Sequence, residues 1–165
     1  MDTNADRQTR NLLIAGLRGE GAHLSLETAV KDFPESLMNE RAPNVSYSFW
    51  HQLEHIRIAQ KDLYHYATNS GIGSPPWPEG YWPEADATAD AADWNRTVAA
   101  IQSDRDRFIA LLEEADTDIF EAREYMDGGS IFRTALLAID HTAYHLGEFV
   151  MGRQILGHWH SRLDQ

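Results

Sequence analysis

The sequence predicts an all-α fold, a four-helix bundle. Four long segments carry apolar residues at spacings of three and four, the period of a helix with one buried face. No two segments alternate in the way that paired strands do, and the chain has no internal repeat. Because 165 residues is the usual size of one domain, we expect residues 1–165 to form a single helical domain.

Two helices are expected before residue 35. The segment 5–18 carries several leucines among polar residues, and Gly19 follows it directly. The segment 24–34 is shorter, with Ser25 placed to cap its start and Pro34 to end it. We therefore expect one long helix followed by a short connecting helix.

The second long helix is expected to run to about residue 68, with either Ser46 or Ser48 as its cap. After it, the segment 69–83 holds four Pro and three Gly, a composition that argues against any regular element. Ordered loops of this length are often functional or packed by their own side chains. Its Trp and Tyr residues favour packing against the helices over contact with a substrate. This Pro/Trp-rich loop is predicted to separate the second and third long helices.

The last two long helices are expected over residues 86–115 and 131–156. The first of these is the clearest amphipathic segment of the chain. An acidic stretch then ends in two glycines, after which Ser130 can cap the final helix. The final helix is apolar over much of its surface, as expected for the most buried helix of a bundle.

The composition excludes several classes of partner and site. Fourteen Lys and Arg against 26 Asp and Glu give a net charge of -12, which repels nucleic acid. No cysteine is present, so any metal must be held by His, Asp or Glu, and a reducing cytoplasm suits the chain. The start lacks a signal-peptide pattern, and no run of about 18 apolar residues occurs. We expect a cytoplasmic protein that binds neither membranes nor nucleic acids.

His141 and His145 are the strongest chemical signal in the sequence. Residues four apart on a helix point the same way, so both imidazoles can reach one ion. Neutral imidazoles are good ligands for zinc, nickel or iron, and a site without thiolates usually recruits a third histidine or a carboxylate. The alternative is a pair of buried histidines that hydrogen-bond to carboxylates.

The third ligand can come from the second long helix, which carries His51 and His55 one turn apart. Spacing alone does not choose between them. His51 lies nearer the helix start, where we expect more solvent, and this favours His55. Glu148, three residues after His145, shares the face of the histidine pair and is the first candidate for an accessory catalytic or orienting group.

Three segments, SYSFWHQLEHIRIAQ, WPEGYWP and LLAIDHTAYHLGEFVMGRQILGHW, resemble the DinB-like superfamily over most of the chain. The resemblance implies a four-helix bundle of the DinB/YfiT-like type. It also implies a metal site made by one histidine of the second long helix and a His-x-x-x-His pair of the last. These positions fall on His55, His141 and His145. His51 matches no ligand of the family, and could be a surface residue, a fourth ligand or a proton carrier.

The function implied by the resemblance is metal-dependent. Relatives include transferases that use bacillithiol, mycothiol or glutathione-type thiols, and a mycothiol-dependent isomerase. We therefore expect a divalent metal, zinc before nickel or iron, that activates a low-molecular-weight thiol for transfer to a small-molecule substrate. Two alternatives stay open: a metal-dependent hydrolase in which Glu148 or His51 moves protons, and a non-catalytic metal-binding or stress-response protein. The resemblance also implies a homodimer.

Overall fold

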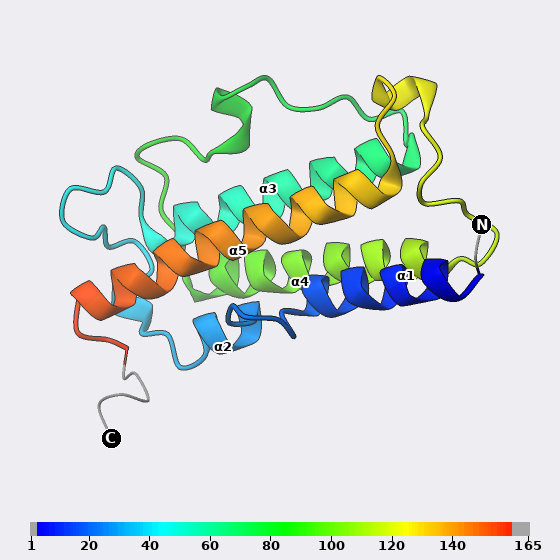
Figure 1. Cartoon of the computed structure of the whole chain (residues 1–165). Coiled ribbons are helices and arrows are strands. Elements are labelled where there is room, and N and C mark those ends of the chain that lie inside the picture. The colour runs from blue at the N-terminus through cyan, green and yellow to red at the C-terminus, as the bar shows by residue number, and fades with distance from the viewer. Residues whose placement is uncertain (1–2, 160–165) are drawn as a thin grey trace.

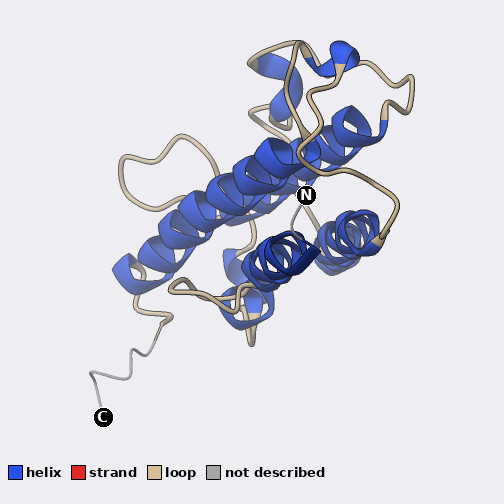
Figure 2. Ribbon diagram, turned by 45° about the vertical axis from the view of Figure 1, so that its right-hand side comes forward, coloured by secondary structure: helices blue, strands red, loops and turns tan. Residues whose placement is uncertain are grey.

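The computed structural model describes residues 3–159, and this part of the chain contains five α-helices and no strand (Figures 1 and 2). The prediction of an all-α fold is confirmed. Three single turns of 3-10 helix, each three residues long, lie in the connections. The five helices are α1 (Thr3–Arg18), α2 (Leu26–Val30), α3 (Phe49–Thr68), α4 (Ala91–Glu113) and α5 (Ile131–Ile155).

The cap of α3 decides between the two serines that the sequence offered. The Ser48 hydroxyl accepts a hydrogen bond from the backbone N–H of His51, and the His51 imidazole lies against the backbone N–H of Ser48. This reciprocal capping box satisfies two backbone donors that a helix start leaves without partners. Ser46 is exposed and lies before the helix.

The start of α4 differs from the expected one. The helix begins at Ala91 and not at residue 86, because Asp90 and Asp93 form a capping box in which each side chain accepts from the other's backbone N–H. Residues 86–89 therefore stay outside the helix. Ser25 and Ser130 cap α2 and α5 as the sequence predicts.

The four long helices pack around a shared interior. Helix α3 packs against α4 and α5, and α1 packs against the same two helices. Figure 1 shows α3 and α5 side by side above α4 and α1, and Figure 2 shows the same two layers from another direction. Two clusters of buried side chains fill this interior. One contains Leu13, Phe108, Leu112, Ile131 and Ala135, and the other contains Leu26, Phe49, Leu53, Trp94 and Phe149.

The loop between α3 and α4 runs along the outside of α3, as the green segment of Figure 1 shows. It contains one 3-10 turn, Glu79–Tyr81, although its Pro and Gly content argued against any regular element. The Tyr81 hydroxyl donates to Asp62 of α3 at 2.6 Å. The side-chain amide of Asn39 makes two hydrogen bonds with the backbone of Ala89. These contacts are among those that hold the loop to the rest of the molecule.

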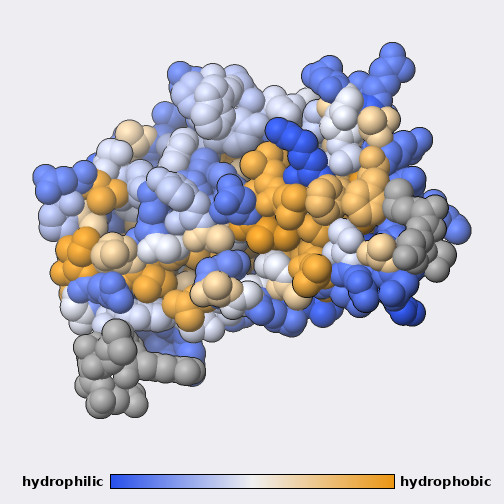
Figure 3. Space-filling model, in the orientation of Figure 1, coloured by the Kyte–Doolittle hydropathy of each residue, from blue (hydrophilic) through white to orange (hydrophobic). Residues whose placement is uncertain are grey.

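The surface over α5 and α1 is rich in hydrophobic side chains on the face drawn in Figure 3. Among the described residues, no helix combines the length and apolar composition needed to cross a bilayer. The large hydrophobic side chains exposed on α1 and α5 are Leu12, Leu136, Leu137, Tyr144, Met151 and Ile155.

Candidate metal centre

Three imidazoles meet between α3 and α5. His55 comes from α3, His141 and His145 come from α5, and we call these three residues the histidine cluster. The Nε2 atom of His55 lies 3.1 Å from the Nε2 atoms of both His141 and His145. Two nitrogens bound to one tetrahedral zinc ion at roughly 2.0–2.1 Å would lie about 3.3 Å apart. The spacing within the histidine cluster therefore fits a single ion.

The partners of the Nδ1 atoms of His55 and His145 indicate which ring nitrogen carries the hydrogen. His55 Nδ1 is 2.7 Å from the backbone carbonyl oxygen of Tyr81, and His145 Nδ1 is 2.8 Å from Glu148 Oε2. A carbonyl or carboxylate oxygen only accepts, so each Nδ1 carries the hydrogen. In their neutral forms both Nε2 atoms then have lone pairs, which face each other at 3.1 Å. A metal ion between them would bind both lone pairs and remove their repulsion.

Burial favours the neutral imidazoles that metal binding requires. Burial, followed by the positive charge that His145 and His55 would carry, lowers the pKa of His141 to about 4. Burial also lowers the pKa of His55. Both rings are therefore neutral at pH 7, which is the state in which imidazole binds metal ions.

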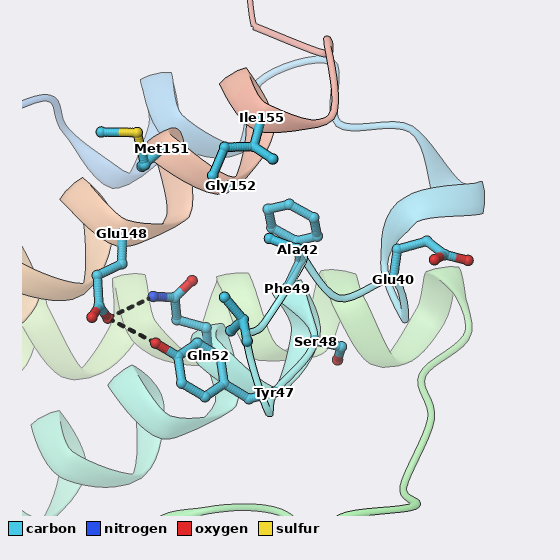
Figure 4. Close-up of a pocket in the computed structure, with 11 residues that line it drawn as sticks. Glu40, Ala42, Tyr47, Ser48, Phe49, Gln52, Glu148, Met151, Gly152 and Ile155 are labelled. Carbon is cyan, nitrogen blue, oxygen red and sulfur yellow. Dashed lines mark hydrogen bonds between the residues drawn. The ribbon is translucent and has the colours of Figure 1, made fainter.

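Glu148 is held in place by three donors, all directed at its Oε2 atom. They are His145 Nδ1 at 2.8 Å, Gln52 Nε2 at 3.0 Å and the Tyr47 hydroxyl at 3.2 Å, the last two drawn in Figure 4. Burial, followed by the charge of Glu148, raises the pKa of Tyr47 to about 12. A carboxylate that accepts from a ligating histidine fixes the ring orientation and raises its basicity as a ligand. Glu148 has this position towards His145.

The loop 69–90 covers His55 with an aromatic ring. The Trp82 indole stacks on the His55 imidazole with ring centroids 3.9 Å apart and planes 3° from parallel. Tyr47 stacks in turn on Trp82 at 4.9 Å. Since Tyr81, the preceding residue, accepts the Nδ1 hydrogen of His55, two consecutive loop residues set the orientation of this imidazole. In contrast, Trp77 of the same loop is 77% exposed.

A model of the DinB superfamily matches residues 20–149 of the chain. The chain belongs to the DinB superfamily. The resemblance that the sequence suggested is thus confirmed, and the matched range contains every member of the histidine cluster. Comparisons with curated proteins and with solved structures gave no match.

In this member of the DinB superfamily, His51 lies outside the histidine cluster. We expected it to be solvated, but the residue is only 4% exposed. Its Nδ1 is 2.5 Å from the Ser48 hydroxyl, and its Nε2 donates to the backbone oxygen of Glu84 at 3.0 Å. The Nε2 hydrogen bond thus ties the start of α3 to the loop, while Nδ1 contacts the cap of the same helix. A proton-carrying role for His51 stays a prediction.

Several residues of this DinB-type site were not singled out from the sequence. Tyr47, Gln52 and Trp82 reach it from outside the His-x-x-x-His segment, and Gln52 is 96 positions from its partner Glu148. The only local signal was the aromatic segment WPEGYWP, which was expected to pack on the helices. Tyr81 and Trp82 do pack there, and they do so on a residue of the histidine cluster.

Proposed function

We propose that His55, His141 and His145 hold one divalent metal ion, zinc before nickel or iron. The observation that carries the proposal is the pair of facing Nε2 lone pairs, fixed by the hydrogen bonds of both Nδ1 atoms. The absence of cysteine also favours a site made of imidazoles. The packing of the four long helices, with the loop 69–90 outside them, supports the finer assignment to a DinB/YfiT-like four-helix bundle.

We infer that the centre serves a thiol-dependent S-transferase. Three imidazoles leave a position open in a four-coordinate site, as catalytic zinc sites do. A divalent metal lowers the pKa of a thiol bound to it, so that a thiolate exists near neutral pH. The thiol gives up its proton, its sulfur forms a bond with an electrophilic carbon of the second substrate, and the leaving group departs with its electron pair.

The residues around the histidine cluster have separate tasks in this proposal. Glu148 holds the His145 ring, compensates positive charge at the centre and is the candidate to receive the thiol proton. Tyr47 and Gln52 hold Glu148 by donating to its Oε2 atom. Trp82 covers one face of His55 and keeps water from it.

The test is thiol binding to the cobalt-loaded protein. Titration with glutathione, cysteine or 2-mercaptoethanol is expected to produce the near-ultraviolet absorption of a cobalt–thiolate bond. The double variant His141→Ala/His145→Ala is expected to lose it, and ethanol is the matched ligand without sulfur. Cobalt binding without any such band, for all three thiols, would contradict the transferase proposal.

Hydrolysis is the second candidate, and the position of Glu148 favours it. The Glu148 carboxylate is hydrogen-bonded to His145, and from this position it can accept a proton from a water molecule as well as from a thiol. Activity that needs no added thiol, and that falls in Glu148→Gln, would distinguish the hydrolase from the transferase.

A non-catalytic protein would be favoured by a closed ligand shell that includes His51, but both ring nitrogens of His51 have other partners.

A further inference from the structure

A cavity of about 180 Å³ lies beside Glu148, between the segment 40–49 and the C-terminal half of α5 (Figure 4). We call it the Glu148 cavity. Its polar end is formed by Glu148, Tyr47 and Gln52, the same side chains that hydrogen-bond at Glu148 Oε2. The rest of its wall is mainly hydrophobic. These hydrophobic lining residues are Ala42, Val45, Phe49, Met151 and Ile155.

The size of the Glu148 cavity fits a ring or a short branched chain. A cavity of roughly 150 Å³ lined by aliphatic and aromatic side chains binds benzene in another protein. Gly152 lines the cavity with helix backbone only, since it has no side chain. A Cβ at this position would lie 3.0 Å from the Phe49 ring. A larger residue at this position would press on the cavity lining.

The charges around the Glu148 cavity exclude an acidic ligand group. Glu148 and Glu40 carry carboxylates on opposite sides of it in Figure 4, and its lining contains no Lys, Arg or His. A carboxylate placed in the hydrophobic part would be desolvated and repelled by both acids. An uncharged apolar group meets neither penalty.

The Glu148 cavity adjoins the histidine cluster through one side chain. Glu148 lines the cavity and its Oε2 atom also accepts from His145 Nδ1. We propose that the Glu148 cavity binds an uncharged apolar group of the substrate, a benzene-sized ring or branched alkyl chain, while the reacting end lies at the histidine cluster. This inference rests on the proposed function and narrows its substrate class.

The first test uses benzyl alcohol, which needs no metal to bind. Amide chemical shifts are followed by NMR in zinc-free and zinc-loaded protein. Saturable shifts at Ala42, Val45 and Gly152 are expected in both forms. The carboxylated analogue 4-(hydroxymethyl)benzoate is expected to bind at least about tenfold more weakly. No saturable shift at these residues, or equal binding of the two probes, would overturn the inference.

Substitutions that fill the Glu148 cavity test the same inference against a control on the surface. Val45→Trp places an indole in it, and Met151→Trp does so from α5, where Met151 is 56% exposed and easily replaced. Leu12→Trp is the control, because Leu12 is 74% exposed on α1. Both cavity variants are expected to lose benzyl alcohol binding, while the control retains it. Folded cavity variants that bind like the parent protein would contradict the proposal.

A second readout separates this inference from the proposed function. Cobalt-loaded protein is titrated with benzyl mercaptan and with ethanethiol, and the cobalt–thiolate band is followed. Tighter binding of benzyl mercaptan, lost in Val45→Trp, supports the inference. Equal binding of both thiols would overturn it while the thiol proposal stands. Benzyl alcohol binding without a band for either thiol would support the cavity and overturn the thiol proposal.

Discussion

His55 and His145 have different partners at Nδ1, and the difference is one of charge. His55 donates to the neutral carbonyl of Tyr81, whereas His145 donates to the carboxylate of Glu148. An ionised acceptor makes the stronger hydrogen bond and strengthens the imidazole as a ligand. His145 is therefore expected to be the strongest ligand of the histidine cluster.

Glu148→Gln tests this ranking. The amide keeps the size of the side chain but removes its charge, and its NH₂ group adds a donor where Tyr47 and Gln52 already donate. We expect zinc affinity to fall by about 10- to 100-fold, measured by competition with a chelator. Glu113→Gln, an exposed position on α4, is the control. An affinity within twofold of the parent would show that Glu148 does not support the ligand.

Tyr47 and Tyr81 are expected to ionise unusually late. Burial, followed by the neighbouring carboxylates of Glu148 and Asp62, raises both pKa values to about 12 from an ordinary value of about 10. The folded state then holds these protons more tightly than the unfolded state. Their contribution to stability is complete below about pH 10 and is lost as pH rises through 12.

Tyrosinate absorbance measures this effect. Tyr47→Phe and Tyr81→Phe should each remove one late-ionising group from the titration of the folded protein. The stability of the parent protein should fall between about pH 10 and pH 12. Variants that instead lose a group titrating near pH 10 would contradict the assigned environments.

Residue type and helical period were enough to predict His141 and His145 as ligand candidates, but they left His51 and His55 open as the third ligand, and the family resemblance pointed to His55. The structure brings His55, His141 and His145 together. The supporting donors could not be predicted in this way, because Gln52 reaches Glu148 across 96 positions of sequence. The burial of His51 was missed for a related reason: its partner Glu84 lies in the loop, not in the helix.

At the scale of elements, the loop 69–90 positions His55 as much as α3 does. Its Tyr81 carbonyl accepts from the imidazole and its Trp82 ring covers it. The composition of the loop predicted irregular backbone. It could not predict which tryptophan would pack, because Trp77 and Trp82 have similar Pro-rich surroundings in the sequence.

Trp82→Ala and Trp77→Ala form a matched pair within this loop. Trp82→Ala removes the stack on His55 and is expected to weaken zinc binding several-fold. It should also lower the free energy of unfolding by about 1–2 kcal/mol. Trp77→Ala should change both by little, since Trp77 is largely exposed. Chelator competition and urea unfolding measure the two effects. Equal effects of the two substitutions would show that the stack does not hold His55.

The cap of α3 gives a second matched pair. Ser48→Ala removes the acceptor for the His51 backbone N–H and should lower the free energy of unfolding by about 1 kcal/mol. Ser46→Ala, at the exposed alternative, should stay within about 0.5 kcal/mol of the parent. Urea unfolding measures both. The ordering would be contradicted if Ser46→Ala were the more damaging change.

At the scale of the whole molecule, the histidine cluster joins α3 to α5. The all-α class could be predicted because apolar residues recur at spacings of three and four, which places them on the buried face of each helix. The Glu148 cavity could not be predicted, since its walls come from the segment 40–49 and from α5, about a hundred residues later. The homodimer implied by the family resemblance stays a prediction, which a solution mass measurement would test.

We propose that His55, His141 and His145 bind one metal ion and that His51 does not. Zinc content after dialysis of tag-free protein tests it directly, with His55→Ala compared against His51→Ala, one turn away on the same helix. We predict about one equivalent of zinc in the parent and in His51→Ala, and none in His55→Ala. No zinc in the parent protein, or zinc lost in His51→Ala but kept in His55→Ala, would show that these three histidines do not form the metal site.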